Sequence, residues 1–135
     1  CGNAVLTRVA KEFDFHAAHV LPHHDGQCRR LHGHTYKLRV IVEGEPQPVN
    51  TMPDEGMVVD FSVLKGIYKE HVEPFVEHQL LNETIVKPGY CLVTTCELMV
   101  EWIARKFIEA WDVPGVRIAE VRLWETPTSW AEVIL

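Results

Sequence analysis

The chain has 135 residues, 47% of them hydrophobic and 24% charged, a composition typical of a globular domain rather than a disordered chain. Its apolar stretches are too short to cross a bilayer, no signal-peptide pattern opens it, and its net charge of −6 argues against nucleic acid or an anionic membrane as a partner. We therefore expect a single domain over residues 1–135, cytoplasmic, with reduced cysteines and a small-molecule ligand.

The first part of the chain predicts two strands joined by a histidine-rich loop. Residues 5–15 alternate between apolar and polar side chains, as in a half-buried strand. A polar loop with a turn signal follows over residues 22–30. Residues 34–44 have the strongest strand pattern, with apolar side chains on one face. Residues 45–57 contain three prolines and are expected to form a loop.

A first helix is expected to begin after Asp60 or Ser62, either of which can cap its first turn. Apolar residues then recur at helical spacing as far as Val72. Pro74 is expected to end or kink this helix, because proline removes a backbone donor and crowds the preceding turn.

A second helix is expected to begin at Thr94, because Thr94-Thr95-Cys96-Glu97 matches a capping box. Its apolar stripe extends to Trp111, and Pro114-Gly115 terminates the region. Residues 117–125 alternate as a strand does, and a short last strand is expected near residues 130–135. The order strand, strand, helix, helix, strand indicates an α+β fold.

Three histidines indicate a metal site. His32 and His34 lie on the same side of an extended chain, and His19 follows the first predicted strand. If the two strands pair as a hairpin, His19 approaches the other two, and three imidazoles with an open fourth position are typical of catalytic zinc. The alternatives are a histidine-rich loop without metal, or a closed site with Cys28 as fourth ligand. His16 would join the site only if its segment were helical.

Other residues are candidates for proton chemistry. Cys28 is followed by two arginines, and neighbouring cations or a metal favour the reactive thiolate, although an unreactive loop thiol is an equal alternative. Glu77-His78 follows the first predicted helix and is either an acid–base dyad or a solvated helix end. Glu125 shares a strand face with apolar residues, so it needs a polar partner, such as the N–H groups of an aminopyrimidinone ring.

Two runs carry a specific motif, Phe15-His16-Ala17-Ala18-His19 and Cys28-Arg29-Arg30-Leu31-His32-Gly33-His34-Thr35-Tyr36. Later matches are Gly56 to Phe61, Glu77 to Asn82, Thr95-Cys96-Glu97 and Glu125-Thr126. Together these residues resemble the 6-pyruvoyl-tetrahydropterin synthase superfamily over nearly the whole chain. Within it, the sequence most resembles the bacterial 6-carboxytetrahydropterin synthases of queuosine biosynthesis.

This resemblance implies a tunnelling fold, which is a four-stranded antiparallel sheet with two helices packed on one face. Members of the superfamily assemble as trimers, usually stacked into hexamers, with active sites between subunits. The resemblance also implies Zn²⁺ as the cofactor. It implies roles for particular residues: His19, His32 and His34 as zinc ligands, Cys28 as catalytic base, His78 and Glu125 in its proton relay, Glu77 beside the relay histidine, and Glu125 as pterin anchor with backbone and hydroxyl groups near Thr95 and Leu81.

The implied reaction converts 7,8-dihydroneopterin triphosphate to 6-carboxy-5,6,7,8-tetrahydropterin, with loss of triphosphate and acetaldehyde. The four-residue step from Cys28 to His32 resembles the carboxy-forming enzymes more than the pyruvoyl-forming ones. The alternatives are the pyruvoyl-forming reaction and a non-catalytic, zinc-stabilised domain. Two positions depart from the family pattern: Glu77 replaces the usual aspartate, and Thr94-Thr95 replaces the Pro-Thr of many members.

Overall fold

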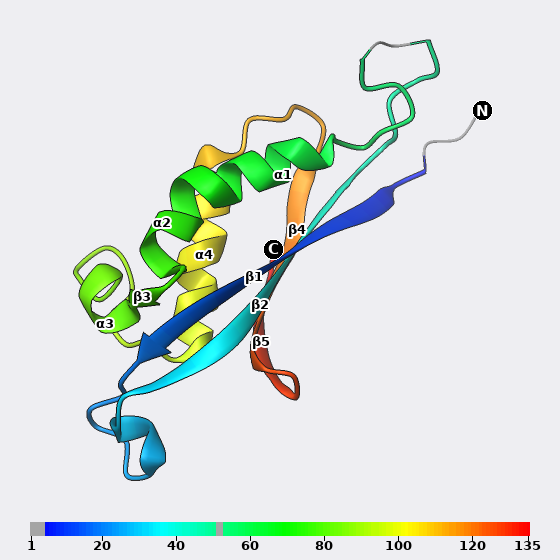
Figure 1. The fold of residues 1–135 in the computed structure, drawn as a ribbon. Helices are drawn as coiled ribbons and strands as arrows, with labels where there is room; N and C mark the ends of the chain where they lie inside the picture. The colour runs from blue at the N-terminus through cyan, green and yellow to red at the C-terminus, as the bar shows by residue number, and fades with distance from the viewer. Residues whose placement is uncertain (1–4, 51–52) are drawn as a thin grey trace.

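The computed structural model describes residues 5–50 and 53–135, and its strands form one twisted sheet (Figure 1). Strand β1 spans Thr7–His19 and pairs antiparallel with β2, His32–Gly44, along its whole length. Strand β4, Arg117–Thr126, pairs antiparallel with β2, and β5, Ser129–Ile134, pairs antiparallel with β4. These elements confirm the predicted strands, and β1 extends beyond residue 15 to His19.

The sheet contains one strand more than the four that were expected. Strand β3 has only two residues, Gln79–Leu80, and pairs parallel with Ala17 and Ala18 of β1. The order across the described sheet is β3-β1-β2-β4-β5. The sheet is therefore mixed, with four antiparallel strands and a short parallel strand that fixes the Glu77-His78 segment beside β1.

The first helical segment consists of α1, Phe61–Ile67, a π-helical turn, Tyr68–Val72, and α2, Glu73–Val76. Asp60 caps it, since its carboxylate accepts a hydrogen bond from the Ser62 N–H at 2.8 Å. Pro74 does not end the segment. The helix changes to π-type before the proline, departs from helical geometry at Val72, and resumes as far as Val76.

Helix α4 spans Cys96–Ala110 and is preceded by the short α3, Leu81–Thr84. The cap of α4 is Thr95, whose side chain accepts from the Leu98 N–H, so the helix begins one residue later than predicted. The α1–α2 segment and α4 lie on one side of the sheet (Figure 1). Between these layers lies the core, which includes Phe15, Tyr36, Leu38, Trp102, Phe107 and Leu123.

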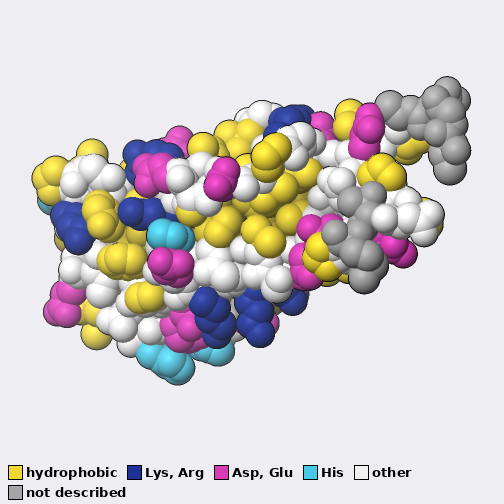
Figure 2. All heavy atoms as spheres, turned by 90° about the horizontal axis from the view of Figure 1, so that it is seen from above, with side chains coloured by type: hydrophobic (Ala, Val, Ile, Leu, Met, Phe, Trp, Pro, Cys, Tyr) yellow, Lys and Arg dark blue, Asp and Glu magenta, His cyan; other side chains and the backbone are white. Residues whose placement is uncertain are grey.

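The surface keeps several large apolar side chains exposed. Figure 2 shows a broad hydrophobic area in the middle of one face, bordered by acidic and basic side chains. At the β5 end of the sheet, Trp130, Ile134 and Leu135 are 47%, 72% and 43% exposed. No helix in the described part of the chain is long and apolar enough to cross a membrane.

Candidate active site

Three histidines meet at the end of the β1–β2 hairpin. His19 is paired with His32, and His34 lies opposite Ala17 two residues further along β2. Because side chains alternate across a strand, all three rings project from the same face of the sheet. One ring nitrogen from each histidine lies within 4.8 Å of the others. Thirteen-residue strands with no register shift therefore bring together ligands that are distant in sequence.

The hydrogen bonds of His19 and His32 leave the same nitrogen, Nε2, free in both rings. His19 Nδ1 lies 2.9 Å from the Thr94 carbonyl oxygen, and His32 Nδ1 lies 2.7 Å from the Arg30 carbonyl oxygen. Since carbonyls only accept, each Nδ1 carries the proton and each Nε2 keeps its lone pair. Within the described chain, the Nε2 atoms of all three histidines are buried without a hydrogen-bond partner. Three inward-facing imidazole lone pairs fit a divalent metal ion.

The surroundings keep these rings neutral. Burial lowers the pKa of His19 to about 4, a shift that the Thr94 carbonyl opposes and that the neighbouring His32 and His34 reinforce. Burial also lowers the pKa of His34, partly opposed by Glu125. Neutral imidazoles are the form that binds a metal. The site is thus prepared for a cation at neutral pH without first losing protons from these two rings.

Glu125 borders the histidine cluster. Its carboxylate oxygens lie 3.8 Å from His19 Nε2 and 4.0 Å from His34 Nε2. It also lines a groove of about 810 Å³ together with His34, Trp124 and Thr126. That volume lies in the range of small-molecule sites. A partly buried carboxylate is therefore available to a polar ligand beside the metal position.

Tyr36 lies under the cluster. Its ring stacks on that of Phe15 with centroids 4.9 Å apart, and meets the His34 ring edge-on with centroids 5.5 Å apart. The hydroxyl is buried without a partner in the described chain. Burial, with Glu125 nearby, raises the pKa of the phenol far above its ordinary value. Tyr36 is therefore a neutral hydroxyl that packs against the candidate ligands.

Cys28 lies in a 3₁₀ turn, Gln27–Arg29, within the loop between β1 and β2. It is partly exposed and lines a pocket with Arg30, His32 and His34. The close three-donor group of His19, His32 and His34 does not include Cys28, so the described structure gives no support to a closed four-ligand site. Cys28 thus shares an accessible pocket with two of the three histidines.

The other described cysteines are structural, and Cys1 lies outside the described residues. Cys91 donates a hydrogen bond to the Val93 carbonyl, and Cys96 donates to the Leu123 carbonyl. Burial raises the pKa of both thiols, that of Cys96 to about 11 with a contribution from Glu125. Cys28 is therefore the described cysteine best placed for chemistry.

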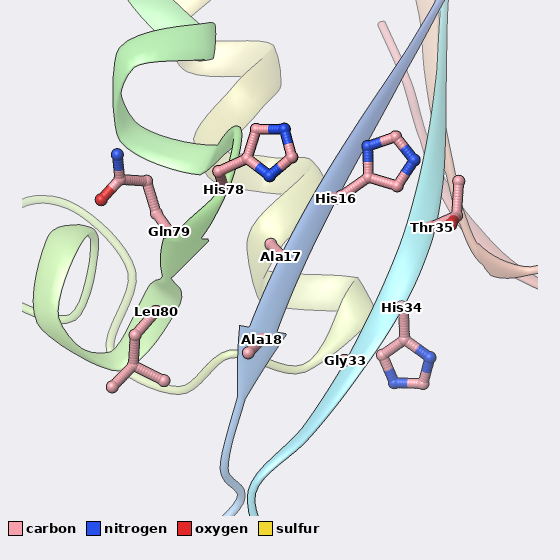
Figure 3. Close-up of a pocket in the computed structure, with 9 residues that line it drawn as sticks. All are labelled: His16, Ala17, Ala18, Gly33, His34, Thr35, His78, Gln79 and Leu80. Atoms are coloured by element: carbon pink, nitrogen blue, oxygen red, sulfur yellow. The ribbon is translucent and has the colours of Figure 1, made fainter.

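Glu77 and His78 lie elsewhere on the chain's surface, beside His16. In Figure 3 the rings of His16 and His78 lie near β1, whereas the ring of His34 lies on the other side of β2. Glu77 Oε1 lies 3.4 Å from His78 Nε2 and 3.3 Å from His16 Nδ1. Partial burial raises the pKa of Glu77, but hydrogen bonds from His16 outweigh this and lower it overall. Neither Glu77 nor His78 lines the Cys28 pocket.

The two remaining predicted residues are Thr95 and Leu81. Thr95 is half-buried, caps α4, and lines a mainly apolar pocket with Val20 and Leu92. The Leu81 side chain is fully buried, so only its backbone can meet a ligand. His23, His24, Arg29 and Arg30 are exposed loop residues.

Several supporting residues were not found from the sequence. Thr94 holds His19 through its carbonyl, and Arg30 holds His32 in the same way. Asn82 accepts from the Val20 N–H at 2.8 Å and donates to the Val20 carbonyl at 2.9 Å, which fixes the chain just after His19. Backbone acceptors leave no sequence signal, because every residue type has a carbonyl group.

The fold and the site define a small α+β protein with a three-histidine cluster that could hold a metal ion, at the end of a β-hairpin, and a cysteine that lines a pocket with two of these histidines. The model of the family described as 6-pyruvoyl tetrahydropterin synthase matches residues 8–134. The chain belongs to this family.

Within this family, the chain is similar to characterised proteins along most of its length. The chain is 43% identical to the 6-carboxy-5,6,7,8-tetrahydropterin synthase of Synechocystis sp. over 123 residues, covering 91% of this chain and 89% of that protein. It is 35% identical to the protein of the same name from Haemophilus influenzae over 143 residues, covering 94% and 98%. The structure of Caenorhabditis elegans 6-pyruvoyl tetrahydropterin synthase superposes with a TM-score of 0.81 at 25% identity, covering 98% and 97%.

Proposed function

We propose that this protein is a zinc-dependent lyase that converts 7,8-dihydroneopterin triphosphate to 6-carboxy-5,6,7,8-tetrahydropterin, with loss of triphosphate and acetaldehyde. The observation that carries the proposal is the set of three buried, unpartnered Nε2 atoms beside the accessible Cys28 thiol. The relatives named 6-carboxy-5,6,7,8-tetrahydropterin synthase, which cover nearly the whole chain, support the choice of product.

His19, His32 and His34 would hold the zinc ion, since their donor atoms already converge. Bound there, zinc would polarise the hydroxyls of the substrate side chain and make protons on the adjacent carbons easier to remove. The carbonyls of Thr94 and Arg30 keep two of these imidazoles in the tautomer that leaves Nε2 free. The protein thus supplies both the ligands and their orientation.

Cys28 is the residue we assign as base. Cys28 lines a pocket with two of the three histidines and is partly exposed, so its thiol is accessible to a substrate there. The thiolate would take a proton from the substrate side chain, and a second group must return a proton elsewhere. Elimination of triphosphate follows, and hydrolytic cleavage of the side chain then consumes one water molecule, which supplies the second carboxylate oxygen and the hydrogens needed to release acetaldehyde.

His78 is assigned as the second proton carrier, with Glu77 as its partner. The two side chains are 3.4 Å apart, but they lie outside the Cys28 pocket of the same chain. This separation supports an active site built between subunits, with Cys28 from one subunit and His78 from another. The protein is accordingly proposed to act as a homo-oligomer, a trimer or hexamer.

Features at the edge of the sheet support assembly. Strand β5 is an edge strand of the described sheet, and Trp130 and Ile134 within it and Leu135 after it are exposed. An open strand edge with apolar neighbours favours pairing with another chain. The three described cysteines are unpaired, which fits the proposed cytoplasmic location.

Glu125 is proposed to anchor the pterin ring, because its carboxylate can accept two hydrogen bonds from adjacent N–H groups. The proposal is supported by the groove that Glu125 lines with His34, and by the 3.8 Å between its carboxylate and His19 Nε2. Thr95 and the backbone of Leu81 are proposed as further contacts. The exposed cations Arg29 and Arg30 and the nearby His23 and His24 are suited to the triphosphate.

Product analysis tests the proposal directly. Zinc-loaded protein is incubated with 7,8-dihydroneopterin triphosphate, and the products are identified by mass spectrometry with a separate assay for acetaldehyde. A 6-carboxytetrahydropterin peak with acetaldehyde supports the proposal. A 6-pyruvoyl product without acetaldehyde would assign the second candidate, which the C. elegans structural relative favours. Unchanged substrate would leave a zinc-stabilised domain without this activity.

A further inference from the structure

A second cluster of potential metal ligands lies away from the three-histidine site. His16 is on β1, and Glu77 and His78 lie between α2 and β3. One donor atom from each of these side chains lies within 4.8 Å of the others. His16 is on the opposite face of β1 from His19, because the two are three residues apart on a strand. The two clusters therefore cannot share one ion.

The distances within this cluster suit a tetrahedral metal. At zinc–ligand bonds of 2.0–2.1 Å, two ligand atoms of a tetrahedral site are about 3.4 Å apart. Glu77 Oε1 is 3.3 Å from His16 Nδ1 and 3.4 Å from His78 Nε2. The rings of His16 and His78 lie nearly parallel, with centroids 5.7 Å apart (Figure 3). To bind a shared ion, the donor nitrogens of His16 and His78, which lie within 4.8 Å of each other, would need to approach to about 3.4 Å.

The backbone holds this arrangement in place. The His16 N–H donates to Glu77 Oε1 at 3.0 Å, and the His78 N–H donates to the His16 carbonyl at 2.7 Å. His78 has a φ of 56°, in the left-handed region that residues other than glycine adopt uncommonly. Such strain persists only where surrounding contacts enforce it. The cluster is thus built by the pairing of β1 with the segment before β3, and its members are not independent surface residues.

The side chains are open to solvent. Within a single subunit, His16 and His78 are 57% and 80% exposed, and Glu77 is 26% exposed. Two imidazoles and one carboxylate are ligands that zinc, nickel and copper accept. Exposure and the lack of a buried shell make such a site weaker than the enclosed three-histidine cluster. It would fill only after the first site is occupied.

We propose that His16, Glu77 and His78 form a second, weaker site for a divalent transition metal, and that an ion bound there inhibits the enzyme. The binding half rests on the geometry alone. The inhibitory half rests on the proposed function, in which His78 carries a proton. A metal on His78 Nε2 occupies the lone pair that would accept this proton, so the histidine cannot act until the ion leaves.

Metal titration tests the binding half without any turnover. Protein loaded with one zinc ion per chain is titrated with Zn²⁺, and separately with Ni²⁺, by isothermal calorimetry. Wild type is expected to show a further binding event, which His16→Gln weakens by at least about tenfold. Loss of a metal ligand should reduce affinity at least as much as loss of a residue that only hydrogen-bonds to a ligand. His71→Gln is the matched control. His71 is exposed and lies 3.9 Å from Glu70, but this pair belongs to no three-ligand group in the described chain.

The control variant is expected to keep the second binding event. Absence of that event in wild type, or equal second-site affinity in wild type and His16→Gln, would overturn the site. Glutamine is chosen at position 16 because its amide can still donate to Glu77 but is a poor zinc ligand.

Kinetics test the inhibitory half. Each protein's rate is normalised to its own rate with one zinc ion per chain, and metal is then added. Wild type and His71→Gln are expected to lose activity over the range in which the second site fills, and a chelator should restore it. His16→Gln should need at least about tenfold more metal. Second-site binding without inhibition would refute the regulation alone. A protein that binds the second ion but lacks synthase activity would instead refute the proposed function.

Discussion

His19 Nδ1 lies 2.9 Å from the carbonyl oxygen of Thr94, 75 residues further along the chain. This bond joins the end of β1 to the residue before the cap of α4, so the His19 ring is held by the helix layer as well as by the sheet. A ligand fixed from two layers keeps its Nε2 aimed at the metal position before any ion arrives.

Loss of a ligand should remove the metal while the fold persists. We predict that His32→Ala lowers zinc affinity by at least about 100-fold. Even removing a residue that only hydrogen-bonds to a metal ligand typically lowers metal affinity by about 10–100-fold. His32 is half-buried at the sheet end rather than in the core, so the variant should still fold. Zinc per chain after dialysis, with circular dichroism as the folding check, measures the effect. His23→Gln, on the exposed loop, should retain zinc, and equal zinc in both variants would contradict the ligand assignment.

Metal-free protein should lose stability as the pH falls from 6.5 towards 4. Burial lowers the pKa of His19 from 6.5 to about 4 in the folded state, so the unfolded chain binds this proton more readily in that interval. The free energy of unfolding should therefore decrease by about 3 kcal/mol at most across the window. The contribution is complete above pH 6.5 and is lost below pH 4. Urea unfolding of chelated protein over this range measures it.

The variant His19→Gln separates this effect from other titrations, because glutamine does not ionise. The stability difference between wild type and the variant should shrink as the pH falls through the window. A difference that stays constant with pH would show that His19 is not the group responsible.

Much of the fold could be predicted because it depends on local pattern. The alternation on β2 places Leu38, Val40 and Val42 in the core, and Asp60 caps the first helix as its residue type suggests. The β3 strand could not be predicted, since two residues carry no periodicity and their pairing depends on the position of β1. The start of α4 was misplaced by one residue because Thr94 and Thr95 are both good caps.

In the candidate site too, features that depend on local sequence pattern could be predicted and features that depend on tertiary packing could not. The H-x-H spacing of His32 and His34 reflects strand geometry, so the metal cluster could be anticipated. The contact of His16 with Glu77 could not, because it joins residues 61 apart through a tertiary packing of β1 on the segment before β3. Residue type alone gave no reason to connect these two side chains.

Removal of the Cys28 thiol should abolish turnover but not metal binding. In Cys28→Ala we expect kcat to fall by about 10²–10⁴-fold, the usual contribution of a positioned base. Zinc should remain, because Cys28 is not part of the close three-histidine group. Steady-state kinetics and zinc analysis on one preparation measure both. Loss of zinc would instead make Cys28 a fourth ligand of a structural site, and full activity would remove it from the mechanism.

An active site shared between subunits makes a sharper prediction. Cys28→Ala and His78→Ala should each be inactive alone, yet active when mixed, unfolded and refolded together. A site that takes Cys28 from one chain and His78 from another is intact in about a quarter of random pairings at equal mixing. The mixture should therefore recover about a quarter of wild-type activity.

The matched control for that experiment mixes Cys28→Ala with the double variant that carries both substitutions. None of its pairings contains both an intact Cys28 and an intact His78, so it should stay inactive. Recovery only in the first mixture would place the two residues on different chains of one site. If neither mixture recovers while refolded wild type does, Cys28 and His78 must act within one chain, and the loop that carries Cys28 would have to move toward β3 during the reaction.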